Sequence, residues 1–122
     1  LYEDEPMAAG VDQDLRARGF MLHKFLFNKS MPIRNSQQHR LVGGAVRDQL
    51  IDGDAVYLRD LTRIGQIDTE GLAHMAILAS GVFASQTVVL ACLDELAQRG
   101  AIGPDLAARY VDHLPARLLR PQ

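Results

Sequence analysis

A single helix–glycine–strand step near the start of the chain limits what this sequence can fold into. Residues 11–18 suit a short helix, and Gly19 stands where a left-handed glycine ends such a helix. Residues 20–27 are then dense in aromatic and apolar side chains over the length of one strand. A helix followed by a strand is the αβ step of an α/β sheet, but one step cannot bury both faces of a sheet. We therefore expect a partial sheet that needs partner strands.

The last third of the chain predicts three short helices. Residues 68–119 are rich in Ala and Leu, and their apolar side chains recur at helical spacing. In the second helix, Arg99 is expected on the solvent side, opposite the apolar face. Short connections between such helices favour an antiparallel bundle. Capping residues, glycines and prolines mark the ends: Asp68 or Thr69 and Gly81 for the first helix, Ser85 and Gly100 for the second, and Pro104 and Pro115 for the third.

The middle of the chain is harder to interpret. Residues 31–67 are typical of an irregular, largely polar connection, with a turn at Gly43–Gly44 and a short strand or helix near residues 41–50. Residues 54–61 are too few for their periodicity to distinguish a helix from a strand. The predicted fold class is therefore α+β, or partial α/β: one helix–strand step followed by a mostly helical C-terminal bundle of about three helices.

Composition excludes several classes of protein. The net charge of −2 argues against a nucleic-acid partner gripped mainly by charge. The longest apolar runs are far shorter than the roughly 20 residues that a membrane span needs, and the acidic first residues do not resemble a signal peptide. We expect a cytoplasmic chain with neither nucleic acid nor membrane as a partner. A first residue of Leu rather than Met suggests N-terminal truncation or processing.

The sequence offers no catalytic residues of a known pattern. The one cysteine, Cys92, lies on the apolar face of a predicted helix and is interpreted as a small buried hydrophobe. The four histidines stand far apart without metal-ligand spacing, so no metal site is expected. Residues 39–48 resemble the Gly-Gly-x-x-Arg-Asp signature of template-independent nucleotidyltransferases. Asp52 follows Asp48 too closely for that fold, so we interpret the motif as an exposed glycine turn.

Three blocks of sequence resemble the C-terminal part of FkbM-type methyltransferases, and they occur in the family's order. The first block holds Tyr-Glu-x-x-Pro at residues 2–6, then Arg-Gly-Phe at 18–20, which opens a Phe-x-Leu-His strand. The second block is Asp-Ala-Val-Tyr-x-Arg-Asp at residues 54–60. The third is the Ala/Leu-rich helical hairpin of residues 69–99, while residues 31–52 match poorly.

The resemblance implies transfer of a methyl group from S-adenosylmethionine to an oxygen, on a sugar or natural-product hydroxyl. The glycine-rich turn and the strand-borne acidic residue that hold the cofactor in such folds are absent from this sequence. We therefore expect S-adenosylmethionine as the cofactor of the full-length enzyme and none for this chain alone. Residues 1–30 would be the distal edge of the Rossmann-like core, residues 31–67 a connection, and residues 68–119 a helical subdomain.

The expected partners are a small-molecule acceptor substrate and either the missing N-terminal part of the enzyme or a second copy of the chain. Tyr2 and Glu3 would follow the end of a strand, where an acceptor docks, so they are the candidate substrate-binding residues. Packing and surface roles for these two residues fit equally well.

Residues beyond this rim are expected to be structural. In the second block, an aromatic wedge and an ion pair from Tyr57, Arg59 and Asp60 would dock the helical tail. Arg47 and Arg63 can meet an anionic substrate group or remain solvated. The alternative function is a non-catalytic helical interaction module whose N-terminal helix and strand complete a partner's sheet.

Overall fold

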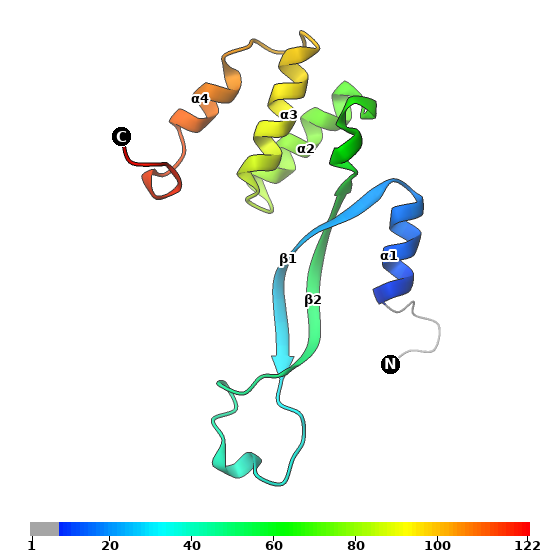
Figure 1. Cartoon of the computed structure of the whole chain (residues 1–122), viewed down its shortest axis with the longest axis vertical. Coiled ribbons are helices and arrows are strands. Elements are labelled where there is room, and N and C mark those ends of the chain that lie inside the picture. The colour runs from blue at the N-terminus through cyan, green and yellow to red at the C-terminus, as the bar shows by residue number, and fades with distance from the viewer. Residues whose placement is uncertain (1–7) are drawn as a thin grey trace. The chain divides into compact units, whose positions relative to one another are not determined.

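The computed structural model describes residues 8–122, which fall into two units that divide between Leu58 and Arg59. We call residues 8–58 the hairpin unit and residues 59–122 the helical unit. These described residues form four α-helices, three short 3-10 helices and one two-stranded sheet (Figure 1). The predicted mixture of helices and strands is therefore confirmed. Tyr2 and Glu3, the candidate substrate-binding residues, lie outside the described part of the chain.

The hairpin unit begins with the predicted helix–glycine–strand step. Helix α1 (Ala8–Ala17) is followed by Gly19 at a φ of +88°, a left-handed conformation that costs a residue with a Cβ about 1–2 kcal/mol. The N–H groups of Arg18 and Gly19 donate to the carbonyls of Leu15 and Arg16, each at 3.1 Å, which closes the end of the helix. The chain then enters β1 (Phe20–Met31), so the step is confirmed.

Strand β1 pairs with β2 (Gln49–Arg59) in an antiparallel sheet (Figure 1). Residues 54–59, whose periodicity was ambiguous, are therefore strand, and the span 31–67 holds β2 and two 3-10 helices rather than an irregular connection alone. The backbone at Gly53 lies very close to β1. A Cβ added at this position would be only 2.8 Å from the carbonyl oxygen of Phe27. Any larger residue at position 53 would push the strands apart.

The strand pair buries little of its own apolar surface. Phe25, Leu26 and Phe27 of β1 are 47–52% exposed, and Leu50 and Ile51 of β2 are likewise exposed. No third strand joins the pair within residues 8–122. A two-stranded sheet alone is marginally stable in water. These side chains therefore need a further layer or further strands to be buried.

The helical unit has its own apolar core. Helices α2 (Thr69–Gly81) and α3 (Gln86–Gln98) pack against each other, and α4 (Leu106–Asp112) packs against α3. Nearly all of the predicted apolar faces are buried: Leu72, Met75, Ala76 and Ala79 from α2, and Val88, Val89, Cys92 and Leu96 from α3. Leu93, also predicted on the apolar face of α3, is only partly buried. Helix α4 begins two residues after Pro104, a small difference from the predicted start.

Two short 3-10 helices flank these elements: η2 (Leu61–Gln66) precedes α2, and η3 (Ala116–Leu118) follows α4. A third, η1 (Gln38–Arg40), lies in the loop between the strands. The predicted capping residues stand at the helix N-termini, but their side chains do not form the capping hydrogen bonds. Asp68 and Ser85 precede α2 and α3, yet neither side chain caps its helix, and the Ser85 hydroxyl donates to the carbonyl of Phe83.

The sequence predicted Arg99 on the solvent side of its helix, and this prediction is wrong: the side chain is largely buried and hydrogen-bonded. Its Nε donates to Glu95 Oε1 at 3.0 Å, and its Nη2 donates to the carbonyls of Ile64 and Gly65 at 3.1 and 3.3 Å. Its Nη1 donates to Thr69 Oγ1 at 3.3 Å. One guanidinium therefore joins the end of α3 to η2 and to the start of α2.

Candidate functional site

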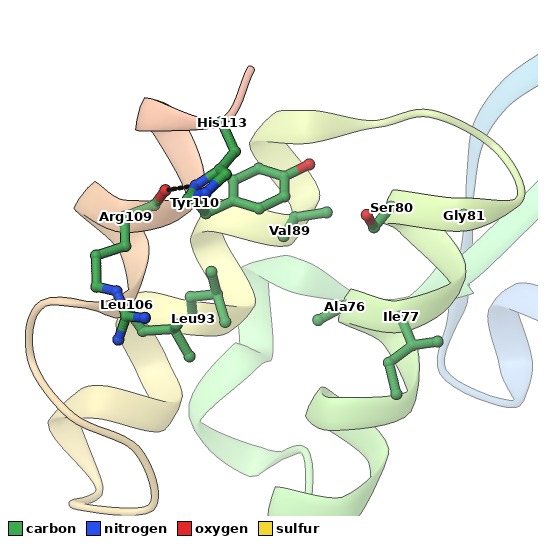
Figure 2. A pocket seen from close by; sticks show the side chains of 10 residues that line it. All are labelled: Ala76, Ile77, Ser80, Gly81, Val89, Leu93, Leu106, Arg109, Tyr110 and His113. Carbon is green, nitrogen blue, oxygen red and sulfur yellow. Dashed lines mark hydrogen bonds between the residues drawn. The ribbon is translucent and has the colours of Figure 1, made fainter.

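A groove in the helical unit is the candidate binding site. It has a volume of about 590 Å³, within the range of small-molecule sites. All three helices of the unit contribute to it (Figure 2). Its walls are Ala76, Ile77, Ser80 and Gly81 of α2, Val89 and Leu93 of α3, and Leu106, Arg109, Tyr110 and His113 at α4.

Small side chains on α2 create the space. Ala76 and Ser80 stand four residues apart, so they share one face of the helix. Across from them lies Tyr110 of α4, whose ring extends over the groove (Figure 2). The floor between is formed by Val89 and Leu93 of α3. The groove therefore offers an apolar slot roofed on one side by an aromatic ring.

Polar groups gather at one end of this slot. The hydroxyls of Tyr110 and Ser80 point toward one another across the opening (Figure 2). His113 Nδ1 lies 2.8 Å from the carbonyl oxygen of Arg109. Because a carbonyl only accepts, Nδ1 carries the hydrogen and Nε2 keeps the lone pair of the neutral ring. The site can thus give hydrogen bonds to a ligand through hydroxyl groups and accept one at an imidazole nitrogen.

The charged side chain that lines the groove is basic, that of Arg109. Arg109 is exposed, and its Nη1 lies 3.8 Å from Asp105 Oδ2. Among the described residues, 8–122, no acidic side chain lines the groove. Its lining suits a largely apolar molecule with a hydroxyl or carboxyl group at one end.

Two residues of the Asp-Ala-Val-Tyr-x-Arg-Asp block, Tyr57 and Asp60, form side-chain hydrogen bonds with a structural role. Tyr57 donates its hydroxyl hydrogen to Asp12 Oδ1 at 2.9 Å, so it fastens β2 to α1 within the hairpin unit. Asp60 caps η2, where its carboxylate accepts from the N–H and the hydroxyl of Thr62. Arg47 and Arg63 are both exposed, the first in the loop between the strands and the second in η2.

The Tyr57–Asp12 contact makes a testable prediction about proton binding. The guanidinium of Arg16 and then the hydroxyl of Tyr57 hold the pKa of Asp12 below its usual value of 3.8. A depressed carboxyl pKa stabilises the fold above the unfolded value and loses that effect as the pH falls through the folded value. Tyr57→Phe should therefore raise the Asp12 pKa toward its usual value and reduce the acid sensitivity of the hairpin unit.

The measurement is an NMR titration of the Asp12 carboxyl carbon in the parent and in Tyr57→Phe. Tyr110→Phe, in the other unit, is the matched control and should leave the Asp12 titration unchanged. An unaltered Asp12 titration in Tyr57→Phe would show that the hydroxyl does not hold this carboxylate.

Cys92 occupies the buried position that the sequence predicts, and His23 lies on the predicted first strand. Cys92 is fully buried, and burial raises the pKa of its thiol, so it is not an activated nucleophile. Burial, with Lys24 as a smaller cause, lowers the pKa of His23 on β1. Within residues 8–122, no three His, Cys, Asp or Glu side chains are placed to hold a metal ion together.

Sequence reasoning did not find the groove. Its signals were the small residues Ala76 and Ser80 on one face of α2, and Tyr110 on a helix too short to cover that face.

Comparison with protein-family models, with curated proteins and with solved structures gives no match. None of the described helices combines the length and apolar character of a membrane span.

Proposed function

We propose that this chain is the distal, acceptor-side part of an S-adenosylmethionine-dependent O-methyltransferase that acts on a sugar or natural-product hydroxyl. The observation that carries the proposal is the strand pair. Phe25, Leu26 and Phe27 of β1 remain about half exposed, which fits the edge of a larger sheet better than a finished one.

The positions of the motif blocks support the same interpretation. Arg18, Gly19 and Phe20 form the junction between α1 and β1, and the Asp-Ala-Val-Tyr-x-Arg-Asp block runs through β2 toward η2. The helix–strand step α1–β1 is the unit from which a Rossmann-like sheet is built. On this proposal the remaining strands, with the cofactor's glycine-rich turn, come from residues outside this chain.

The groove supplies the acceptor's side of the reaction. Its apolar walls would hold the body of the acceptor, and the hydroxyls of Tyr110 and Ser80 would bind its polar groups. Methyl donor and acceptor would then be bound by different parts of one enzyme. This division explains why the chain has a ligand-sized groove but no cofactor motif.

Complementation tests the proposal. The region encoded ahead of residue 1 is produced as a separate polypeptide, mixed with this chain, and supplied with labelled S-adenosylmethionine and a panel of sugar and phenolic acceptors. Methyl transfer is expected only in the mixture. Gly53→Val, which places a side chain against the Phe27 carbonyl, should abolish the complementation.

Two results would contradict the proposal. One is an upstream region that transfers methyl groups at the same rate without this chain. The other is an upstream region that gives no S-adenosylmethionine-dependent reaction but still joins this chain. The second result would favour the alternative function, a non-catalytic module that completes a partner's sheet.

A further inference from the structure

One segment of the chain contains basic residues and no acidic ones. Residues 20–47 contain no acidic residue, whereas all 15 acidic residues of the chain lie elsewhere. The net charge of −2 therefore conceals a strongly basic segment. Five basic residues belong to it: Lys24, Lys29, Arg34, Arg40 and Arg47.

Three of these five residues, all arginines, lie in the loop of residues 32–48, which connects β1 to β2 (Figure 1) and ends in one acidic residue, Asp48. Arg34, Arg40 and Arg47 are all exposed. Within residues 8–122, none of them forms an ion pair, and Arg40 Nη1 donates at 3.3 Å to the neutral side chain of Gln37. Their charges are therefore available to an anionic partner.

Aliphatic side chains are exposed beside these arginines. Ile33 is 60% and Val42 75% exposed, and Leu41 is also exposed. Exposing large apolar side chains to water is unfavourable. A group of them next to cations therefore indicates a contact surface. The loop contains no Phe, Tyr or Trp, so it lacks the stacking platform typical of proteins that bind single-stranded nucleic acid.

Local hydrogen bonds give the loop a defined shape. The Asn35 amide nitrogen donates to the carbonyl of Ile33 and to Gln38 Oε1, both at 2.9 Å. The Asn35 carbonyl oxygen accepts from the N–H of Gln37 at 2.9 Å. This turn fixes the backbone between Ile33 and η1, so less ordering entropy is lost when the loop meets a partner.

We propose that the loop of residues 32–48 docks on an anionic lipid bilayer. Arg34, Arg40 and Arg47 would bind lipid phosphates and carboxylates, while Ile33 and Val42 would enter the boundary between headgroups and acyl chains. The expectation that no membrane is a partner came from the whole-chain charge and from the lack of a span. Neither observation bears on a peripheral contact, and the proposal is independent of the methyltransferase function.

Sedimentation with vesicles tests this docking. Vesicles of phosphatidylcholine with about one-third phosphatidylserine should bind the 122-residue chain, and pure phosphatidylcholine should bind it far more weakly. Each arginine is expected to contribute about fivefold, so Arg34→Gln, Arg40→Gln and Arg47→Gln together should weaken binding by about 100-fold. Ile33→Ser with Val42→Ser should also weaken it, without reducing its dependence on salt.

The matched control removes three exposed arginines outside the loop: Arg18→Gln, Arg117→Gln and Arg120→Gln. This variant has the same net charge as the loop variant and should bind nearly as well as the parent. Equal loss in the two variants, or equal binding to neutral and anionic vesicles, would overturn the proposal. Tighter binding to a single-stranded oligonucleotide than to the anionic vesicles would overturn it in favour of a nucleic-acid site.

Discussion

Replacing Leu72 with Ala is expected to lower the free energy of unfolding of the helical unit by about 3 kcal/mol. Leu72 lies on α2 and is fully buried in the core that α2 forms with α3. The substitution removes apolar contacts and leaves a cavity, because closely packed neighbours relax only in part. Urea unfolding followed by far-ultraviolet circular dichroism measures the change.

Leu78→Ala is the matched control for this prediction. Leu78 belongs to the same helix but is 50% exposed, so the same atoms are lost without a buried cavity. We expect a change of roughly 0.5 kcal/mol or less, as for most surface substitutions. Equal losses for Leu72 and Leu78 would mean that α2 does not bury the face described above.

Replacing Arg99 with Ala is expected to destabilise the helical unit by about 2–3 kcal/mol. The guanidinium donates to the carbonyls of Ile64 and Gly65, and to Glu95 and Thr69, and Arg99 keeps only 23% of its side-chain exposure. Its removal leaves two carbonyl oxygens and the largely buried carboxylate of Glu95 without their donor. Amide hydrogen exchange should accelerate most in η2 and in the first turn of α2.

Two further variants separate the geometry of Arg99 from its charge. Arg99→Lys keeps the charge but cannot reproduce four donated hydrogen bonds, so an intermediate loss is expected. Arg109→Ala removes an exposed arginine that is 3.8 Å from Asp105, and it should cost less than about 1 kcal/mol. If Arg99→Lys were as stable as the parent, the guanidinium fork would not be what joins α3 to η2.

The helices and the first strand could be predicted because their signals are local. The apolar stripe through Leu72 and Met75 defines α2, and Gly19 and Gly81 fall where helices end. Strand β2 could not be predicted with the same certainty. Its residues are exposed on both sides at Leu50 and Ile51, so the usual alternation is missing, and pairing with β1 decides its conformation.

The groove and the Arg99 contacts depend on tertiary placement. Arg99 follows α3 in sequence, but its acceptors at Ile64 and Gly65 are more than 30 residues away. The groove requires Ala76 and Ser80 to face Tyr110 across α3, which no local pattern reveals. Counting charge over the whole chain concealed the stretch of residues 20–47, which holds Arg34, Arg40 and Arg47 and no acidic residue.

The described residues hold a groove of ligand size and a two-stranded sheet with exposed apolar side chains. The groove of the helical unit and the strand pair of the hairpin unit belong to different units, and each can be tested by itself. The proposed methyltransferase function depends on the strand pair. The proposed bilayer contact depends on the loop, so failure of either proposal leaves the other standing.

Calorimetric titration with S-adenosylmethionine tests the central claim most directly. The purified 122-residue chain should give no saturable heat, because the cofactor's glycine-rich turn is absent from its sequence. A polypeptide that joins this chain to the region encoded ahead of it should bind one S-adenosylmethionine per chain. Micromolar one-to-one binding by the 122-residue chain alone, or no binding by the joined polypeptide, would contradict the claim that this chain is the acceptor-side part of a methyltransferase.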